Sequence, residues 1–214
     1  MLSDVIRSQL QNIIRGARLQ GPADRCSTVR NILVESFGAS STLKGEFESR
    51  SIIKERQVEF LKNYAQKSDL WLETLLSGTE YLTRGGESKV YLAADRLNVI
   101  KTNDAIYYAT WTEYFNSLVL HNVLFPNTSY SLLGFMEIEG NLNVVLLQPF
   151  IEGEQAKLSD IKELLSFNGF ENTKRQDYYN REFGLVLEDM HDENVISRQG
   201  LLFFIDTVFY IMTI

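Results

Sequence analysis

Residues 184–209 read GLVLEDMHDENVISRQGLLFFIDTVF, and this stretch decides the fold. Two apolar runs flank a polar loop and a hairpin turn, which predicts short strands. Asp189 and Asn194 lie five positions apart in the loop, and Asp206 ends the second apolar run. Side-chain oxygens of Asp and Asn are hard ligands of the kind that Mg²⁺ prefers. Taken alone this spacing is a weak signal of a metal site, and it becomes informative only if the upstream chain carries further motifs of the same chemistry in the right order.

Upstream of this stretch, the pattern of apolar and polar residues changes at Gly78. Beyond it, apolar and polar residues alternate between turns, which predicts three antiparallel strands, then a helix, then two more strands joined at 139–141. A helical stretch and the hairpin follow. The expected ranges are 79–84, 88–94 and 98–102 for the first strands, about 105–122 for the helix, 131–139 and 142–150 for the next strands, and 158–167 for the last helix. This order predicts an α+β fold.

Residues 1–78 have the 3- and 4-residue apolar spacing of amphipathic helices. We expect helices over 2–20, stopped by Gly21-Pro22, over 23–37, ended by Gly38, and over about 52–77, capped by Gly78, with a flexible loop at 38–51. The predicted organisation is an N-terminal helical extension over 1–78, a sheet-rich part over 79–152 and a shorter, largely helical part over 153–214.

The composition is that of an ordinary globular protein, with 44% hydrophobic and 23% charged residues among 214. A net charge of −7 without a basic tract argues against nucleic-acid binding. Cys26 is the only cysteine, which excludes an internal disulfide and fits a reducing cytoplasm. The N-terminus lacks the apolar run of a signal peptide. The apolar segment 201–214 is too short to span a membrane and predicts a buried strand.

Three groups upstream of the hairpin suggest phosphate chemistry. Gly85-Gly86-Glu87-Ser88 separates the first two strands, where glycines let backbone N–H groups approach phosphates. Alone this motif favours a plain hairpin turn, and the lysine-bearing strand that follows favours the phosphate-binding interpretation. Lys101 follows two β-formers in NVIKTN and resembles the phosphate-binding lysine of V-A-I-K, against the alternative of a solvated strand-end lysine. Glu113 lies on the next helix, either as the ion-pair partner of Lys101 or as a surface residue.

The segment 148–153, QPFIEG, leaves the fifth strand where a kinase has its adenine-binding hinge, with Gln148 and Phe150 as candidates. Four weak motifs in the order of a kinase are much stronger together than any one alone. His191 follows Asp189 by two positions, as in D-L-H-x-x-N loops, and either contacts phosphate or braces the loop. Asp192 and Glu193 are expected to be solvated turn residues.

On these motifs the chain resembles the Ser/Thr/Tyr kinase-like domain of polyvalent proteins of phages and conjugative elements. The resemblance covers about 58–214 through GGESKVYLAADRLNVIKTND, EYFNSLVLHNVLFPNTSYSLLGF, VVLLQPFIEG and LEDMHDENVI…LLFFIDTVF, and ERQVEFLKNYAQKSDLW is similar to the family's leading helix. It implies a protein-kinase-like two-lobed fold with an antiparallel five-stranded small lobe and an abbreviated large lobe. It also implies ATP, Mg²⁺ and a bacterial cytoplasm.

Carried over by position, the resemblance implies Gly85 and Gly86 for the phosphate loop, Lys101 for phosphate, Asp189 as the catalytic aspartate, and Asn194 and Asp206 as metal ligands. Ser88, Glu113, Gln148 and Phe150 are further candidates for the nucleotide site. The sequence also departs from protein kinases. Leu187 replaces the histidine of H-R-D, and Thr207-Val208 replaces the end of D-F-G.

We therefore keep three hypotheses: a phosphotransferase acting on a protein or a small molecule, a pseudokinase-like module that binds nucleotide and a host factor, and an unrelated α+β fold with an accidental motif. No nucleic acid or membrane partner is expected.

Overall fold

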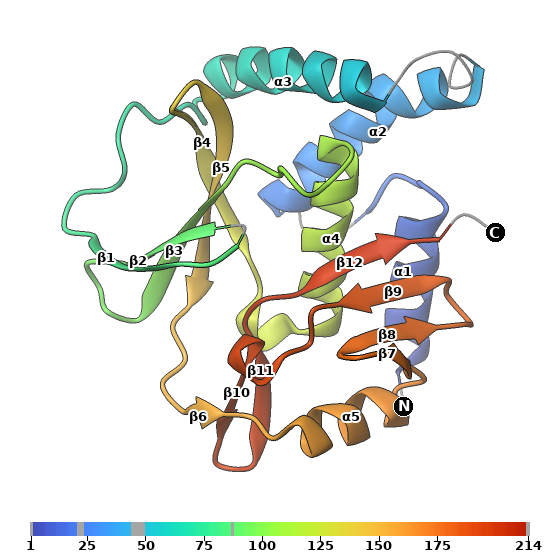
Figure 1. Cartoon of the computed structure of the whole chain (residues 1–214). Helices are drawn as coiled ribbons and strands as arrows, with labels where there is room; N and C mark the ends of the chain where they lie inside the picture. The colour runs from blue at the N-terminus through green and yellow to red at the C-terminus, as the bar shows by residue number, and fades with distance from the viewer. Residues whose placement is uncertain (1, 21–23, 44–49, 87, 213–214) are drawn as a thin grey trace. The chain divides into compact units, whose positions relative to one another are not determined.

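The computed structural model describes residues 2–20, 24–43, 50–86 and 88–212, apart from the side chains of 39–43. The chain divides into two compact units. The first comprises Met1–Leu19, Asn116–Ser129 and Ile151–Ile214, and the second comprises Gln20–Phe115 and Tyr130–Phe150. The division falls inside helix α4 (Trp111–Leu124; Figure 1) and splits the predicted extension over 1–78 between the units.

An antiparallel sheet of five strands in the order β1-β2-β3-β5-β4 dominates the second unit (Figure 1). Its strands confirm the five predicted from alternation, and Glu139 and Gly140, both with positive φ, form the expected turn between the last two. The strands are β1 (Glu80–Arg84), β2 (Ser88–Leu92), β3 (Asn98–Asn103), β4 (Ser131–Ile138) and β5 (Asn141–Pro149).

The two faces of this sheet have different roles. Ala93, Ile100, Met136 and Val145 form a buried cluster, against which Leu72 and Leu75 pack. Because successive side chains of a strand point to opposite faces, Lys101 in β3 faces away from the cluster that contains Ile100.

The segment 68–77 is not the end of a long helix, so that prediction was wrong. Helix α3 (Arg50–Lys67) ends where Asp69 takes a positive φ of 55° and the Leu70 N–H donates to the Ala65 carbonyl. The chain then pairs with β4 through hydrogen bonds between Leu72 and Phe135 and between Phe135 and Leu70. A Cβ at Gly134 would lie 2.3 Å from the Leu70 oxygen, so this close approach requires glycine.

Three other helix boundaries differ from the prediction. Helix α1 (Asp4–Ile14) ends six residues early because Gly16 takes a left-handed φ of 66° and the Ala17 N–H bonds back to the Asn12 carbonyl. Helix α2 (Arg25–Leu43) continues through Gly38 into the expected loop, whose residues 44–49 lie outside the described ranges, as does the predicted stop at 21–22. Helix α4 begins at Trp111, where the Thr110 hydroxyl accepts the Glu113 N–H, rather than near 105.

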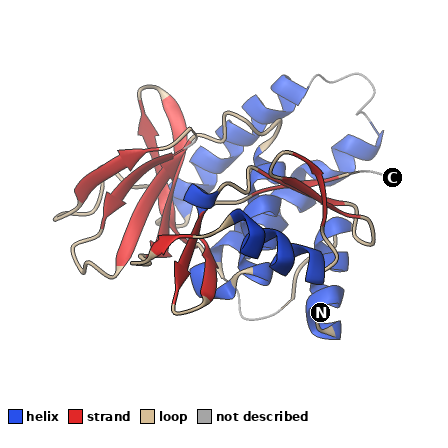
Figure 2. Ribbon diagram, turned by 60° about the horizontal axis from the view of Figure 1, so that its bottom comes forward, coloured by secondary structure: helices blue, strands red, loops and turns tan. Residues whose placement is uncertain are grey.

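The first unit contains helix α1, the C-terminal part of α4 and helix α5 (Leu158–Phe167), which matches its predicted range. Residues 153–214 are richer in strand than predicted, with seven strands beside that one helix in their described part (Figure 2). The single buried strand expected over 201–214 is two strands separated at Asp206. The strands are β6 (Glu154–Gln155), β7 (Glu171–Lys174), β8 (Asp177–Asn180), β9 (Leu185–Glu188), β10 (Val195–Arg198), β11 (Leu201–Phe204) and β12 (Val208–Ile211).

These strands form two antiparallel sheets, in the orders β11-β10-β6 and β12-β9-β8-β7. The short 3₁₀ helices η1 (Pro126–Thr128) and η2 (Asp192–Asn194) complete the unit. In the part of the chain that is described, no helix combines the length and the apolar character that crossing a membrane requires.

Candidate active site

Strand register brings the three polar residues of the C-terminal hairpin to one junction in the first unit. Strands β9 and β12 are antiparallel, with Glu188 opposite Val208, so Asp189 leaves β9 where Asp206 and Thr207 enter β12. Strands β10 and β11 pair Val195 with Phe204, which places Asn194 beside the same segment. The Asn194 carbonyl accepts the N–H groups of Ile205 at 2.9 Å and Asp206 at 3.4 Å.

The Asn194 side chain is oriented by Asp189. Its amide nitrogen donates to the Asp189 carbonyl oxygen at 2.7 Å and lies 3.4 Å from a carboxylate oxygen of Asp189. Because the nitrogen is engaged there, the amide oxygen, which is the metal-binding end of the side chain, points away from Asp189.

His191 holds the other side of the Asp189 carboxylate. Its Nε2 lies 2.8 Å from Asp189 Oδ1, and about half of each side chain is exposed. A ring protonated at Nε2 donates this hydrogen bond whether or not the second nitrogen carries a proton. The histidine therefore braces the loop, one of the two roles considered from the sequence. Asp192 is half-buried and Glu193 is exposed in the turn η2, in keeping with their expected turn positions.

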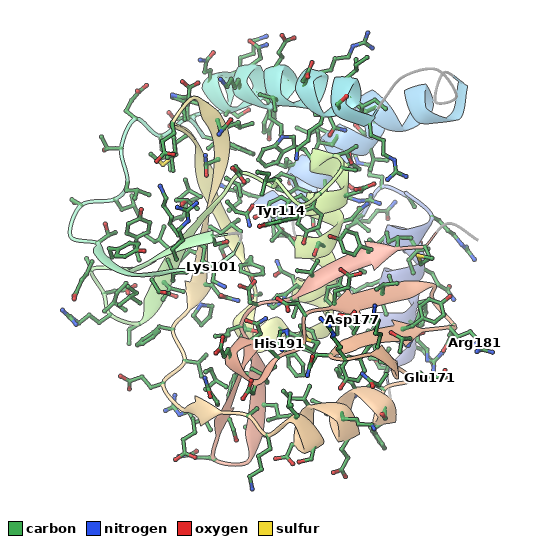
Figure 3. The ribbon with its side chains drawn as sticks, viewed as in Figure 1. Lys101, Tyr114, Glu171, Asp177, Arg181 and His191 are labelled. Atoms are coloured by element: carbon green, nitrogen blue, oxygen red, sulfur yellow. The ribbon has the colours of Figure 1, made fainter. Side chains whose placement is uncertain are left out.

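Asp177 belongs to the same neighbourhood and was not found from the sequence. It starts β8 (Figure 3), and its carboxylate accepts the Asp189 N–H at 3.2 Å. Burial and the charges of Asp177 and Asp189 raise the pKa of the neighbouring Glu188. The polar run ENTKRQDYYN at 171–180 has no apolar alternation that predicts a hairpin, so only the fold reveals this contact.

The donor set of the junction fits Mg²⁺. Asn194 offers a carbonyl oxygen and Asp206 a carboxylate, both hard ligands, and Asp206 is half-buried. Within the described ranges, no group of three or more His, Cys, Asp and Glu side chains is arranged as a metal site. Two protein ligands are nevertheless the ordinary number where waters and substrate phosphates complete the coordination of Mg²⁺.

Lys101 is buried in the second unit, which excludes the solvated strand-end alternative. Its residue is 6% exposed, and its ammonium group lies 5.5 Å from the centroid of the Tyr130 ring. A cation over an aromatic face is attracted by the quadrupole of the ring. The position of Lys101 in β3, between Val90 of β2 and Leu146 of β5, fixes the start of its side chain (Figure 3).

The glycine turn is closed by a hydrogen bond from the Gly85 N–H to the Ser88 carbonyl at 2.8 Å. Neither Gly85 nor Gly86 has a positive φ, and a Cβ at Gly86 would meet nothing within 4 Å. The backbone conformation and the surroundings of these two residues therefore do not require glycine, and a phosphate contact at this turn remains a prediction. Ser88 is buried, and its hydroxyl accepts the Asn103 side-chain amide at 3.1 Å.

The Glu113 side chain makes its contacts around the start of α4. Its carboxylate accepts the Ala109 N–H at 3.0 Å and lies 3.7 Å from Arg50. A pair with Lys101 remains a prediction.

The candidate hinge residues lie at the end of β5. Gln148 is buried, and the Phe150 N–H donates to the Leu97 carbonyl at 2.9 Å. That hydrogen bond ties the exit of β5 to the turn before β3, which fixes the path of the chain there.

Comparison with known proteins identifies one family. Searches of curated proteins and of solved structures found no match. The family described as Serine/Threonine/Tyrosine Kinase found in polyvalent proteins matches residues 54–213, which include all the site residues discussed above. This match covers well over half of the chain and agrees with the resemblance seen in the sequence, so the chain belongs to the Ser/Thr/Tyr kinase family of polyvalent proteins.

Proposed function

We propose that this protein is an ATP- and Mg²⁺-dependent phosphotransferase of the protein-kinase-like, two-lobed fold, and that its acceptor is a hydroxyl group of a protein. The observation that carries the proposal is the junction of Asp189, Asn194 and Asp206. Strand register brings the backbones of Asp189, Asn194 and Asp206 to one junction, and the Asn194 carbonyl accepts the Asp206 N–H there, which supports the proposal. Membership in a kinase family supports the same chemistry.

Each residue of the junction has a role in this proposal. Asp189 accepts or orients the proton of the acceptor hydroxyl, and His191 holds its carboxylate in place. Asn194 through its amide oxygen and Asp206 through its carboxylate would hold Mg²⁺. When bound, Mg²⁺–ATP supplies the transferable phosphoryl group and neutralises charge on its oxygens.

The second unit supplies the nucleotide contacts in this proposal. Lys101 contacts the α- and β-phosphates, and Glu113 supports Lys101. The turn at Gly85, Gly86 and Ser88 offers backbone N–H groups to phosphate. Gln148 and Phe150 belong to the adenine-binding segment. The same proposal assigns the protein to the cytoplasm of a bacterium that carries a mobile element.

A second candidate is a pseudokinase-like module that binds nucleotide and a host factor without phosphoryl transfer. One observation favours it: the Glu113 carboxylate already accepts the Ala109 N–H at the start of α4. A glutamate held there is less available to Lys101 than a free one.

Phosphoryl transfer from labelled ATP distinguishes the candidates. With Mg²⁺ present, we expect transfer to host proteins or to the protein itself, and a loss of about 10²–10⁴-fold in Asp189→Ala, because a positioned acid–base group contributes that much. Glu193→Ala, an exposed acid in the same loop, is the matched control and should retain transfer. Wild type that labels no more than Asp189→Ala would reject the phosphotransferase, and nucleotide binding without transfer would favour the second candidate.

A further inference from the structure

A chain of buried hydrogen bonds holds the segment Phe204–Thr207 at both ends. The Thr128 hydroxyl donates to the Phe204 carbonyl at 2.7 Å. The Thr207 hydroxyl lies 2.7 Å from His121 Nδ1, and His121 Nε2 lies 2.9 Å from the Thr128 carbonyl oxygen. His121 is fully buried, and Thr128 and Thr207 are nearly so. The chain therefore connects the residue two before Asp206 to the residue directly after it.

The Thr128 carbonyl fixes the tautomer of a neutral His121 ring. A carbonyl oxygen only accepts, so His121 Nε2 carries the hydrogen toward Thr128. In the neutral ring, Nδ1 then has a free lone pair, and the Thr207 hydroxyl donates to it. His121 Nδ1 thus requires a hydrogen-bond donor at position 207. Valine has the same shape as threonine but has no hydroxyl group to donate.

Further contacts leave little freedom between the two anchors. The N–H groups of Ile205 and Asp206 both reach the Asn194 carbonyl, and the Phe125 ring stacks on Phe204 at 4.1 Å between centroids. Asp206 is therefore confined before, at and after its own peptide unit.

We propose that His121 and Thr207 are positioning residues that set the carboxylate of Asp206 for binding a divalent metal with nucleotide. The inference rests on the proposed function, because Asp206 is the metal ligand there. A metal ligand on a short connection between two strands loses affinity when its backbone relaxes, since binding must then order it again. The buried hydrogen bonds of His121, Thr128 and Thr207 restrict this backbone before the metal binds.

The alternative is that these buried hydrogen bonds only stabilise the fold. Helix α4, which carries His121, also carries a residue that serves as a matched control. Ser117, one helical turn before His121, accepts the Phe209 N–H through its hydroxyl at 2.9 Å. This hydrogen bond is buried and joins α4 to β12, as the His121–Thr207 contact joins α4 to the residue just before β12. Ser117→Ala should therefore lower stability as Thr207→Val does, without loosening Asp206.

The test measures metal binding rather than turnover. Mn²⁺ is titrated into the protein with a non-hydrolysable ATP analogue, and free Mn²⁺ is followed by electron paramagnetic resonance. We expect Thr207→Val to bind Mn²⁺ about 10-fold more weakly than wild type, Thr207→Ser to bind as wild type because it retains the hydroxyl, and Ser117→Ala to bind as wild type. Asp206→Ala should lose most binding. Circular dichroism establishes that each variant is folded, and Thr207→Ala replaces Thr207→Val if the valine prevents folding.

The outcomes separate this inference from the function on which it rests. Wild type that binds no Mn²⁺–nucleotide would reject the proposed function and the inference together. Wild type that binds, with Thr207→Val equal to it, would reject only the positioning role. Equal weakening in Ser117→Ala and Thr207→Val would also reject it, because a general loss of packing would then explain both.

Discussion

Asp189 has a left-handed backbone, with φ of 62°, which is uncommon outside glycine. Asp tolerates this conformation better than most residues because its short side chain makes local hydrogen bonds. The Asp189 N–H donates to the Asp177 carboxylate, and the Asp189 carbonyl accepts the Asn194 side-chain amide. The Asp189 carboxylate is held by His191. A strained backbone conformation that several neighbouring hydrogen bonds maintain is typical of functional positions.

The ionised Glu188 carboxylate lowers the stability of the folded state, so stability depends on pH here. Its pKa is raised by burial and by the charges of Asp177 and Asp189. A carboxyl group with a higher pKa in the folded state binds protons more tightly there than in the unfolded chain. Stability therefore falls as pH rises through the unfolded pKa of about 4.3 and up to the folded one, and the penalty is complete above it.

We predict that Glu188→Gln raises the melting temperature at about pH 7 by on the order of 1–2 °C, and that the difference shrinks toward about pH 4, where wild type is protonated. Thermal unfolding at both pH values measures it. Glu193→Gln, at an exposed position in the following turn, should show no such pH-dependent gain. A Glu188→Gln variant that is less stable at neutral pH would contradict the prediction.

At the scale of elements, α3 fixes the start of α4. Gln57 is 1% exposed, and its side-chain oxygen accepts the Trp111 N–H at 2.7 Å and lies 3.4 Å from the Thr112 nitrogen. Its amide nitrogen donates to the Thr112 hydroxyl at 2.8 Å. Lys54, one turn earlier, donates to the carbonyls of Ala105 and Tyr108 in the preceding loop. Free N–H groups at a helix start thus find acceptors on another helix.

Gln57→Leu should lower the free energy of unfolding by about 1–3 kcal/mol, because it leaves buried N–H groups of α4 without an acceptor. Gln57→Glu keeps the acceptor and adds a negative charge at a helix N-terminus, which is favourable, so it should recover much of that loss. Urea unfolding of the three proteins measures the difference. Equal losses in both variants would show that packing, rather than hydrogen-bond acceptance, is what Gln57 provides.

The sequence predicts elements well where a period is strong. Strands β1–β5 and helix α5 follow from alternation and apolar spacing. Helix ends depend on single residues in left-handed conformations, such as Asp69, which no pattern marks. Strands β7 and β8 are short and polar, so their pairing with β9 comes from tertiary context. Asp177 and His121 were missed for the same reason, since each acts on residues far away in the sequence.

At the scale of the molecule, ligand binding and stability are linked. The second unit has one sheet and the first has two. A ligand that binds only the folded chain raises its stability by mass action. At a concentration of about 100 times its Kd, a ligand contributes about 2.7 kcal/mol. The gain depends on residues that contact the ligand, whereas stability without ligand depends on packing, so variants can separate the two.

We predict that Mg²⁺–ATP raises the melting temperature of wild type, by several degrees near saturation for a chain of this size. Lys101→Met replaces the buried ammonium group with an apolar side chain of similar length, and it should lose most of the gain with ligand, measured against its own melting temperature without ligand. Asp206→Ala should lose the part of the gain that requires Mg²⁺. Glu193→Ala, exposed and outside the proposed contacts, should keep the full gain. Differential scanning fluorimetry measures all four proteins with and without ligand. A gain that Lys101→Met retains in full would show that the nucleotide binds elsewhere, because a phosphate contact removed from a true site weakens binding directly.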